Sequence, residues 1–308
     1  MARLIDVAAF KLEPFMRHIF LILSVLALSA CSTFQGYVER SAITKPVLSF
    51  QEFADADKAS FQRVDHSPLD RFLSKYLVTT EPDHPIGLGA NFIRYQEVTA
   101  QDKQQLDAYI DSLQATQVSA LNRNEQLAFW INLYNAETIR RVIENAPVAS
   151  IRSIQSSPLD LKGPWNDVRL NVEGTDLSLD QIENNIVRPV FSDPRIHYGL
   201  NCAAIGCPNL RAQAYKGVSV EASLDEQARK FINTERGVKI ENGKVTASRI
   251  FLWYDIDYGE SEADVLNHIR QYASPDLKKA LTGVTDISGY DYDWDINDAA
   301  NLTAPSGS

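Results

Sequence analysis

The stretch from Arg195 to Pro208 holds the residue types that could do chemistry. Its sequence is Arg-Ile-His-Tyr-Gly-Leu-Asn-Cys-Ala-Ala-Ile-Gly-Cys-Pro, with His197, Cys202 and Cys207 close together. We call residues 195–208 the His-Cys segment. A cysteine thiolate activated by a neighbouring base is the nucleophile of thiol-dependent hydrolases and transferases. The segment therefore predicts Cys202 as a nucleophile acting on an amide or ester, with His197 as the first candidate for its base.

The spacing of His197 and Cys202 argues against a direct pair. Residues five apart face opposite sides of a strand and lie roughly 140° apart around a helix. Asn201 shares a face with His197 in either conformation, so His197 is expected to orient or hydrogen-bond a neighbour. A base for Cys202 would then come from elsewhere, the candidates being His66, His84 and His268, or an indirect arrangement through Glu183 and buried asparagines.

A disulfide between Cys202 and Cys207 is the alternative to a free thiol. An oxidising envelope compartment permits such a bridge. Five residues of helix would separate the Cα atoms by roughly 8 Å, beyond the roughly 7 Å limit for bridging, so a turn is needed, which Gly206 and Pro208 could make. So small a loop gains little stability from chain entropy, and the bridge would serve local shape or redox response. The protein would then be a non-catalytic binding or structural protein.

A long apolar helix is predicted from Asn122 to a stop near Pro147, and it should be the central buried helix. Asn132 and Asn135 stand three apart on one of its faces, where buried amides must find partners. Together with Glu183, which lies in a later predicted helix, they are the further candidate catalytic residues of a cleft beside the His-Cys segment.

Five residues are candidates for substrate binding: Arg188, Arg195, Asn201, Trp253 and Tyr254. The two arginines flank the His-Cys segment and could bind a carboxylate, or equally pair with Glu183 or Asp193. The aromatic rings could stack on sugars or peptides, or simply belong to the core.

Metal and cofactor chemistry finds little support in the sequence. Two cysteines and one histidine this close do not match the paired spacings of zinc modules. The acidic residues Asp255, Asp257, Glu260 and Glu262 are most simply a solvated loop, with a weak calcium site as the alternative. No phosphate-binding glycine loop, Gly-x-Ser-x-Gly elbow or dinucleotide fingerprint occurs. We therefore expect no metal and no cofactor.

The composition excludes one class of partner. The chain of 308 residues is 44% hydrophobic and has a formal net charge of −10. A phosphate backbone needs a Lys/Arg footprint that such a chain lacks, so nucleic acid is not expected as a partner.

The N-terminus predicts export and lipidation. Residues 19–30 form an apolar run too short to span a bilayer but right for a signal peptide, and Met16-Arg17-His18 suits the true start better than residues 1–15. Leu28-Ser29-Ala30-Cys31 resembles the lipobox of bacterial lipoproteins. The resemblance implies that Cys31 is acylated and becomes the mature N-terminus. Ser32 after it implies transfer to the outer membrane, with the domain facing the periplasm and an envelope substrate or protein as its partner.

The predicted organisation is a signal peptide at 1–30, a lipidated tether at 31–49, a single globular domain at 50–297 and a disordered tail at 298–308. Helices are predicted at 68–77, after Thr99, at 122–147, from Ser178 to Pro189, at 224–232, 263–272 and 275–281. Short strands are predicted at 91–95 and in hairpins at 168–179 and 238–246, the second turning at Asn242-Gly243. Helices outnumber hairpin strands without βαβ alternation, so the fold class is α+β, a helix-rich single domain.

Five blocks, in order, resemble the domain-of-unknown-function 547 family: Asn124–Asn135, Ser178–Glu183, Arg195–Cys202, Cys207-Pro208 and Ile250–Tyr254. The resemblance covers roughly residues 66 to 297 and implies a single domain without an assigned activity. A cysteine-hydrolase-like fold is an alternative within the α+β class. Many members have histidine where Asn184 stands, and plant members have serine in place of Cys207. These departures imply that Cys202 is the better candidate for shared chemistry and Cys207 for an optional bridge.

Overall fold

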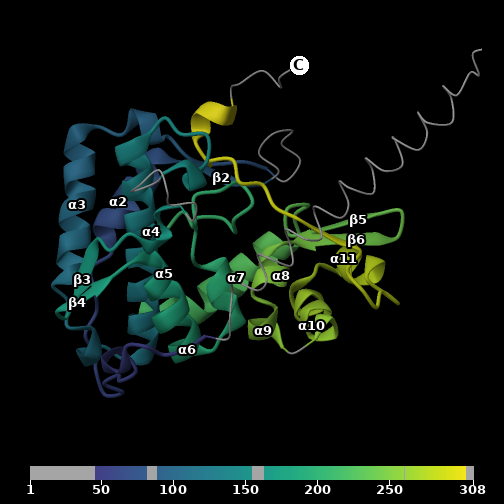
Figure 1. Ribbon diagram of the computed structural model, residues 1–308, viewed down its shortest axis with the longest axis horizontal. Helices are drawn as coiled ribbons and strands as arrows, with labels where there is room; N and C mark the ends of the chain where they lie inside the picture. Colours follow the sequence, from purple (N-terminus) through teal and green to yellow (C-terminus); the bar gives the residue numbers. More distant parts are fainter. Residues whose placement is uncertain (1–45, 82–88, 155–162, 260, 303–308) are drawn as a thin grey trace, which may run out of the picture. The chain divides into compact units, whose positions relative to one another are not determined.

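The long apolar helix predicted from the sequence is α4 (Arg123–Asn145), the central helix of the fold (Figure 1). The structure is a computed structural model that describes residues 46–81, 89–154, 163–259 and 261–302. The Asn122 side chain caps it by accepting a hydrogen bond from the Glu125 amide at 3.1 Å, which satisfies one of the free donors of its first turn. Its residues from Glu125 to Ile139 are all buried, so α4 forms the centre of the core. Trp130 packs edge-on against Phe53 there, with ring centroids 5.0 Å apart.

Two further helices precede α4 in the chain and build the N-terminal part of the core. They are α2 (Ser67–Tyr76) and α3 (Ala100–Gln114), and α3 packs beside both α2 and α4. Thr99 caps α3 by accepting from the Asp102 amide at 3.1 Å, as predicted. The buried residues Leu106, Tyr109, Ile110 and Leu113 follow the predicted helical spacing of its apolar face.

The strands of the described residues form three small sheets, which confirms the α+β class. In the first, β1 (Leu77–Thr79) is antiparallel to β2 (Asn91–Ile93). In the second, β3 (Leu170–Val172) is antiparallel to β4 (Thr175–Leu177). In the third, β5 (Val238–Glu241) is antiparallel to β6 (Lys244–Ser248), which in turn is parallel to β7 (Gly289–Asp291).

Both predicted hairpins turn at two residues with positive φ. These residues are Glu173 and Gly174 (φ 50° and 84°) between β3 and β4, and Asn242 and Gly243 (φ 51° and 74°) between β5 and β6. Positive φ at both central positions suits the twist of a two-residue hairpin, and Asn-Gly is the sequence that adopts it at least cost. The hairpin registers therefore follow from local turn chemistry.

The helix predicted to end at Pro189 continues to Phe191, so that boundary was wrong. It is divided into α5 (Leu179–Gln181), a wider π-helical turn η6 (Ile182–Val187) and α6 (Arg188–Phe191). Proline breaks a helix because it lacks an N–H and its ring clashes with the carbonyl one turn earlier. The π turn η6 ends at Val187, so Pro189 stands in the first turn of α6, where a proline is tolerated, and the helix ends where Ser192 adopts a left-handed conformation.

The remaining α-helices of the described residues lie in the C-terminal half of the chain. They are α7 (Val220–Ile232), α8 (Ile250–Trp253), α9 (Asp255–Tyr258), α10 (Glu262–Tyr272) and α11 (Pro275–Ala280). Short helical turns are η1 (Gln51–Phe53), η2 (Tyr95–Glu97), η3 (Val118–Ala120), η4 (Ile151–Ser153), η5 (Pro164–Asn166), η7 (Pro194–Tyr198), η8 (Gly217–Ser219) and η9 (Ala299–Leu302).

The C-terminal segment, residues 289–298, returns to the His-Cys segment, which the sequence did not predict. After β7 the backbone amides of Ile205 and Gly206 donate to the carbonyls of Asp295 and Asp293, both at 2.8 Å. Farther along the chain, Asp298 forms an isolated parallel β-bridge with Ile93 of β2. Figure 1 shows this segment in yellow, running from the β5–β6 hairpin towards β2. It therefore contributes side chains to the region around the two cysteines.

The predictions for the N-terminus concern residues outside the described part of the chain. The signal peptide, the start at Met16, the lipidated Cys31 and most of the tether fall within residues 1–45, and the end of the predicted tail falls within 303–308. Among the residues that the structure does describe, no helix has the length and apolar character needed to cross a bilayer.

Candidate functional site

The two cysteines of the His-Cys segment form a disulfide. Cys202 and Cys207 have Cα atoms 6.3 Å apart, closer than a helix would place them, because the chain turns between them. Ala203 has a φ of 63° in this turn. A Cβ on Gly206 would lie 2.8 Å from the backbone nitrogen and oxygen of Asp293, so only glycine lets the C-terminal segment approach the loop this closely. Gly206 therefore allows the C-terminal segment to pack directly against the disulfide loop.

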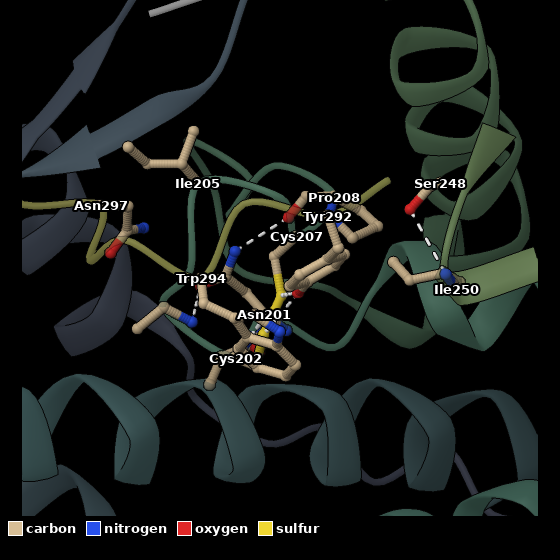
Figure 2. Close-up of a disulfide and its surroundings, with 12 residues drawn as sticks. Asn201, Cys202, Ile205, Cys207, Pro208, Ser248, Ile250, Tyr292, Trp294 and Asn297 are labelled. Carbon is tan, nitrogen blue, oxygen red and sulfur yellow. Dashed lines mark hydrogen bonds between the residues drawn. A yellow bond between two sulfur atoms is a disulfide. The ribbon is translucent and has the colours of Figure 1, made fainter. Parts of the chain in front are cut away.

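Tyr292 of the C-terminal segment contacts both sulfur atoms. Its hydroxyl oxygen lies 3.1 Å from Cys202 Sγ and 3.2 Å from Cys207 Sγ. Its ring stacks obliquely on Trp294 and Trp253, with centroids 4.6 and 4.8 Å away, and Figure 2 shows the tyrosine beside the bridge. Burial raises the pKa of Tyr292, so its hydroxyl stays protonated and able to donate at neutral pH. Trp253, a predicted substrate-binding residue, here packs within this aromatic cluster.

The two candidate asparagines of α4 bind backbone instead of facing an open site. Asn132 donates to the Tyr215 carbonyl at 2.8 Å and accepts from the Tyr215 amide at 2.9 Å. Asn135 donates to the Gly199 carbonyl at 2.9 Å and accepts from the Asn201 amide at 2.8 Å. Each amide thus uses both of its functions to hold one loop against the central helix, which is the role that buried amides with satisfied partners usually have.

The side chains of Asn201 and Arg236 hydrogen-bond the backbone of the disulfide loop. Asn201 donates to the Pro208 carbonyl at 2.8 Å and accepts from the Ala203 amide at 3.0 Å. Arg236 donates to the carbonyls of Ile205 and Cys207, both at 2.6 Å. Burial lowers the pKa of Arg236 to about 10, which still leaves it charged at neutral pH. The loop is therefore fixed by polar contacts as well as by the bridge.

His197 hydrogen-bonds Asp257 of α9, and not Asn201, the residue expected to share its face. Its Nε2 lies 2.7 Å from Asp257 Oδ2, and Arg188 donates to both oxygens of the same carboxylate at 2.6 and 2.8 Å. Burial alone would raise the pKa of Asp257, but the bonds from His197 and Arg188 outweigh it and hold that pKa at about 2. The ring of Tyr254 stacks on His197 with centroids 3.9 Å apart.

Asp257 was predicted to belong to a solvated acidic loop, and this was wrong. Its side chain is only 11% exposed and its carboxylate is used by His197 and Arg188. A carboxylate that is desolvated must be paired, and α9 presents it to both partners. Glu260 lies outside the described residues. Within the part of the chain that the structure covers, no group of three or more His, Cys, Asp or Glu side chains is arranged to hold a metal ion.

Glu183 lies in the π-helical turn η6, with its carboxylate against two tyrosines. Tyr134 of α4 donates to Glu183 Oε2 at 3.1 Å. Burial, and then the Glu183 carboxylate, raise the pKa of both Tyr134 and Tyr254 well above the ordinary value. Tyr254 also stacks on His197, which bonds Asp257. The Tyr254 ring therefore lies between Glu183 and the His197–Asp257 pair. Single π turns in helices frequently mark functional sites, because the wider turn re-aims one side chain.

The other candidates lie apart from the disulfide. Arg195 pairs with Asp193 at 2.6 Å, as one alternative predicted, and also with Asp225 at 2.9 Å and with Glu221. His66 Nδ1 lies 2.7 Å from the Tyr109 hydroxyl, and His268 Nε2 lies 2.9 Å from the Tyr198 hydroxyl. Burial lowers the pKa of both histidines to about 4. His84 lies outside the described residues.

Among the described residues, Cys202 has a polar neighbour, and none of the candidate histidines bonds its sulfur. Of the described side chains, that of Tyr292 hydrogen-bonds the two sulfur atoms. His66, His197 and His268 hydrogen-bond other residues. Sequence reasoning did not name Tyr134, Arg236 or Tyr292, and it assigned Asp257 to a solvated loop. Tyr134 lies inside the Asn132–Asn135 motif and Asp257 three residues after Tyr254, so their helical spacing was a usable signal. Nothing in the sequence linked Arg236 or Tyr292 to the cysteines.

A polar groove lies next to the disulfide loop. It has a volume of about 510 Å³, and its lining includes Thr79, Asn91, Asn209, Gln213, Gln227 and Lys230. Asn209 connects it to the loop, since its side-chain oxygen accepts from Arg236 at 2.9 Å and its amide nitrogen donates to Gly89 at 2.7 Å. Gln227 of α7 donates to the Asn209 carbonyl at 2.7 Å. Asn209, two residues after Cys207, is thus part of the groove lining.

Comparison with known proteins supports the family resemblance over part of the chain. A family model described as "Protein of unknown function, DUF547" matches residues 118–232. This range contains α4, Glu183 and the whole His-Cys segment, and it ends before Asp257 and Tyr292. No curated protein and no solved structure matches the chain significantly. The match carries no assigned activity, and the cysteine-hydrolase-like alternative stays a prediction.

Proposed function

We propose that the protein is a lipoprotein of the bacterial envelope, held at the membrane by an acylated Cys31, whose domain binds a partner with its cysteines bridged. The observation that carries the choice of binding over thiol catalysis is the Cys202–Cys207 disulfide. A bridged cysteine has no thiolate to attack an amide or ester. The asparagines that could have served a nucleophile bond backbone instead.

Thiol labelling of the exported protein tests this choice. The protein is taken from intact cells under acid quench and treated with a maleimide, before and after reduction. We expect Cys202 and Cys207 to be protected until a reductant is added. Fast labelling of Cys202 near neutral pH without reductant would contradict the proposal and favour a free thiol.

The polar groove is the surface that suits such a partner. Its lining offers donors and acceptors together with charges of both signs, Lys230 and Glu226 among them. None of the described residues that line it is aromatic, so it has no ring on which a sugar could stack. An extended peptide segment, which carries backbone donors and acceptors along its length, fits these groups best.

Site-specific photocrosslinking in living cells tests the groove. A photoreactive residue replaces Gln213, an exposed residue of the lining, and for comparison Lys278, an exposed residue of α11. We expect one discrete crosslinked product from position 213. An additional Lys230→Glu substitution in the groove should lower the yield of that product. Equal crosslinking from both positions would refute a specific groove partner.

Lipidation has its own test. Resemblance of Leu28–Cys31 to a lipobox supports the anchor. Metabolic labelling with an alkyne fatty acid should mark the wild-type protein, and Cys31→Ser should abolish the label and leave the protein as an unprocessed precursor. Retained label in that variant would overturn the anchor without affecting the groove.

A thiol-dependent hydrolase or transferase is the second candidate. The Tyr292 hydroxyl at the Cys202 sulfur, and the electrostatic proximity of Glu183 to that tyrosine, favour it if the bridge opens. The labelling result separates the two candidates, because this function requires free Cys202 in the resting protein.

A further inference from the structure

The disulfide has two chemically unequal sulfurs. Cys202 is partly exposed, whereas Cys207 is only 5% exposed. In thiol–disulfide exchange the incoming thiolate must reach one sulfur while the other leaves with the electron pair. Access alone therefore favours attack at Cys202.

The donors around the bridge favour the same direction. Cys207 Sγ accepts from the Cys202 backbone amide at 3.0 Å, a donor that Cys202 Sγ does not share, whereas the Tyr292 hydroxyl lies near both sulfurs, 3.2 Å from Cys207 and 3.1 Å from Cys202. A disulfide sulfur carries no hydrogen, so the tyrosine must be the donor in its contacts with both sulfurs. The charged guanidinium of Arg236 bonds the Cys207 carbonyl at 2.6 Å. Hydrogen-bond donors and a nearby cation stabilise a thiolate, so Cys207 is the better leaving group.

The loop is also held when the sulfur–sulfur bond is absent. Asn201 bonds the Pro208 carbonyl, Asn135 bonds the Asn201 amide, and Arg236 bonds two carbonyls of the loop. These contacts do not involve either sulfur atom. The two cysteines therefore stay near one another after reduction, and the bridge can close again without refolding.

We propose that Cys202 and Cys207 form a redox-active pair that exchanges with an external dithiol, with Cys202 as the attacked sulfur and Cys207 as the leaving sulfur. This activity goes beyond binding at the groove and does not depend on it. The incoming thiolate forms a bond to Cys202 Sγ while the Cys202–Cys207 bond breaks, and the electron pair remains on Cys207 as a thiolate. The second thiolate of the same reagent attacks the mixed disulfide and releases Cys202. The reagent leaves as its own disulfide, and the protein gains two electrons and two protons.

Tyr292 touches the reacting sulfurs and is the catalytic residue of this exchange. Its hydroxyl already donates towards the atom on which negative charge develops. Losing one hydrogen bond to a charged sulfur should slow the reaction about tenfold. Phenylalanine at this position keeps the ring contacts with Trp253 and Trp294, so the aromatic cluster is preserved.

Mapping the site of attack in the wild-type protein tests the proposal directly. The purified oxidised protein is exposed briefly to reduced glutathione, quenched with acid and alkylated, and its peptides are identified by mass spectrometry. We expect the glutathione on Cys202 and the alkyl group on Cys207, with at least tenfold preference. Glutathione mainly on Cys207, or no adduct until the protein is unfolded, would overturn the proposal.

Rates of reduction by dithiothreitol supply the second measurement. Tyr292→Phe should react about tenfold more slowly than wild type. Tyr290→Phe, two residues before Tyr292, removes a hydroxyl of β7 that donates to Glu262 and should react at the wild-type rate. Near-ultraviolet circular dichroism establishes that both variants keep the aromatic packing. Equal rates for Tyr292→Phe and wild type would refute the role of the hydroxyl. Resting-state thiol labelling and groove crosslinking test the proposed function, and neither measures which sulfur is attacked. Failure of the exchange proposal can therefore be distinguished from failure of the proposed function.

Discussion

Asn135 holds Asn201 in place through the backbone: its side-chain oxygen accepts from the Asn201 amide at 2.8 Å while its nitrogen donates to Gly199, two residues earlier. One residue of the central helix therefore fixes the backbone directly before Cys202. The Asn201 side chain then reaches across the loop to Pro208. The position of the first cysteine is thus set by α4 through two asparagines.

Replacing Asn135 with alanine should reduce the free energy of unfolding by about 2–4 kcal/mol, because two buried backbone groups lose their partners. Asn145→Ala is the matched control, since Asn145 is an exposed residue near the end of the same helix and should cost less than about 1 kcal/mol. Urea denaturation measures both. Similar losses for the two variants would mean that Asn135 is not a structural anchor.

Replacing Glu183 with alanine should cost about 2–3 kcal/mol, because it leaves the buried hydroxyl of Tyr134 without its acceptor. Tyr134→Phe in the same background should then cost little more, so a double-mutant cycle should give a clear coupling energy between them. Glu97→Ala, at an exposed position, should be nearly neutral. Simple additivity of the two buried substitutions would argue against the hydrogen bond.

Replacing Asp257 with alanine should destabilise the fold by about 3–5 kcal/mol, because Arg188 loses both bonds to a carboxylate in a buried setting. The stacking of His197 on Tyr254 should also loosen, since the histidine loses the bond that orients it. Asp286→Asn, an exposed aspartate, serves as control. Chemical denaturation gives the stability, and histidine NMR signals report the ring. An unchanged unfolding midpoint would show that the triad is dispensable.

Acid should destabilise the protein well above the pKa of its carboxylates. His66 and His268 have a folded-state pKa of about 4, below the unfolded value of about 6.5. The unfolded chain binds more protons between these values, so stability is complete above about pH 6.5 and falls as pH drops towards 4. The full loss is on the order of 3 kcal/mol per histidine. Thermal unfolding from pH 7 to 4.5 measures it, and His66→Gln with His268→Gln should flatten the profile; an unaltered slope would exclude these groups.

Gly206→Ala should separate the disulfide loop from the C-terminal segment. The added Cβ would lie 2.8 Å from backbone atoms of Asp293, which cannot turn aside as a side chain can. We expect a loss of about 1–3 kcal/mol and a change in the near-ultraviolet signal of Tyr292 and Trp294. Gly289→Ala is the control, because its Cβ would meet only Thr246 at 4.0 Å. A silent Gly206 variant would contradict this close packing.

The sequence alone determined the local elements. Apolar spacing located α2, α3, α4 and α7, the residues Asn122 and Thr99 marked helix starts, and Asn242-Gly243 marked a hairpin. These features depend on contacts between residues that are close in the chain, and for that reason they are visible in it. The helix that runs through Pro189 was missed because a π turn has no distinctive sequence pattern.

Only the tertiary structure decided which residues surround the cysteines. Tyr292 is separated from Cys202 by 90 residues, and Asp257 from His197 by 60, so no periodicity could link them. The sequence left Cys202 and Cys207 either free or bridged, because a five-residue spacing allows both, and only the folded path of the chain between them brings the Cα atoms to 6.3 Å. Residue types set what chemistry could occur at this site, while long-range packing of the C-terminal segment set which groups are close enough to take part.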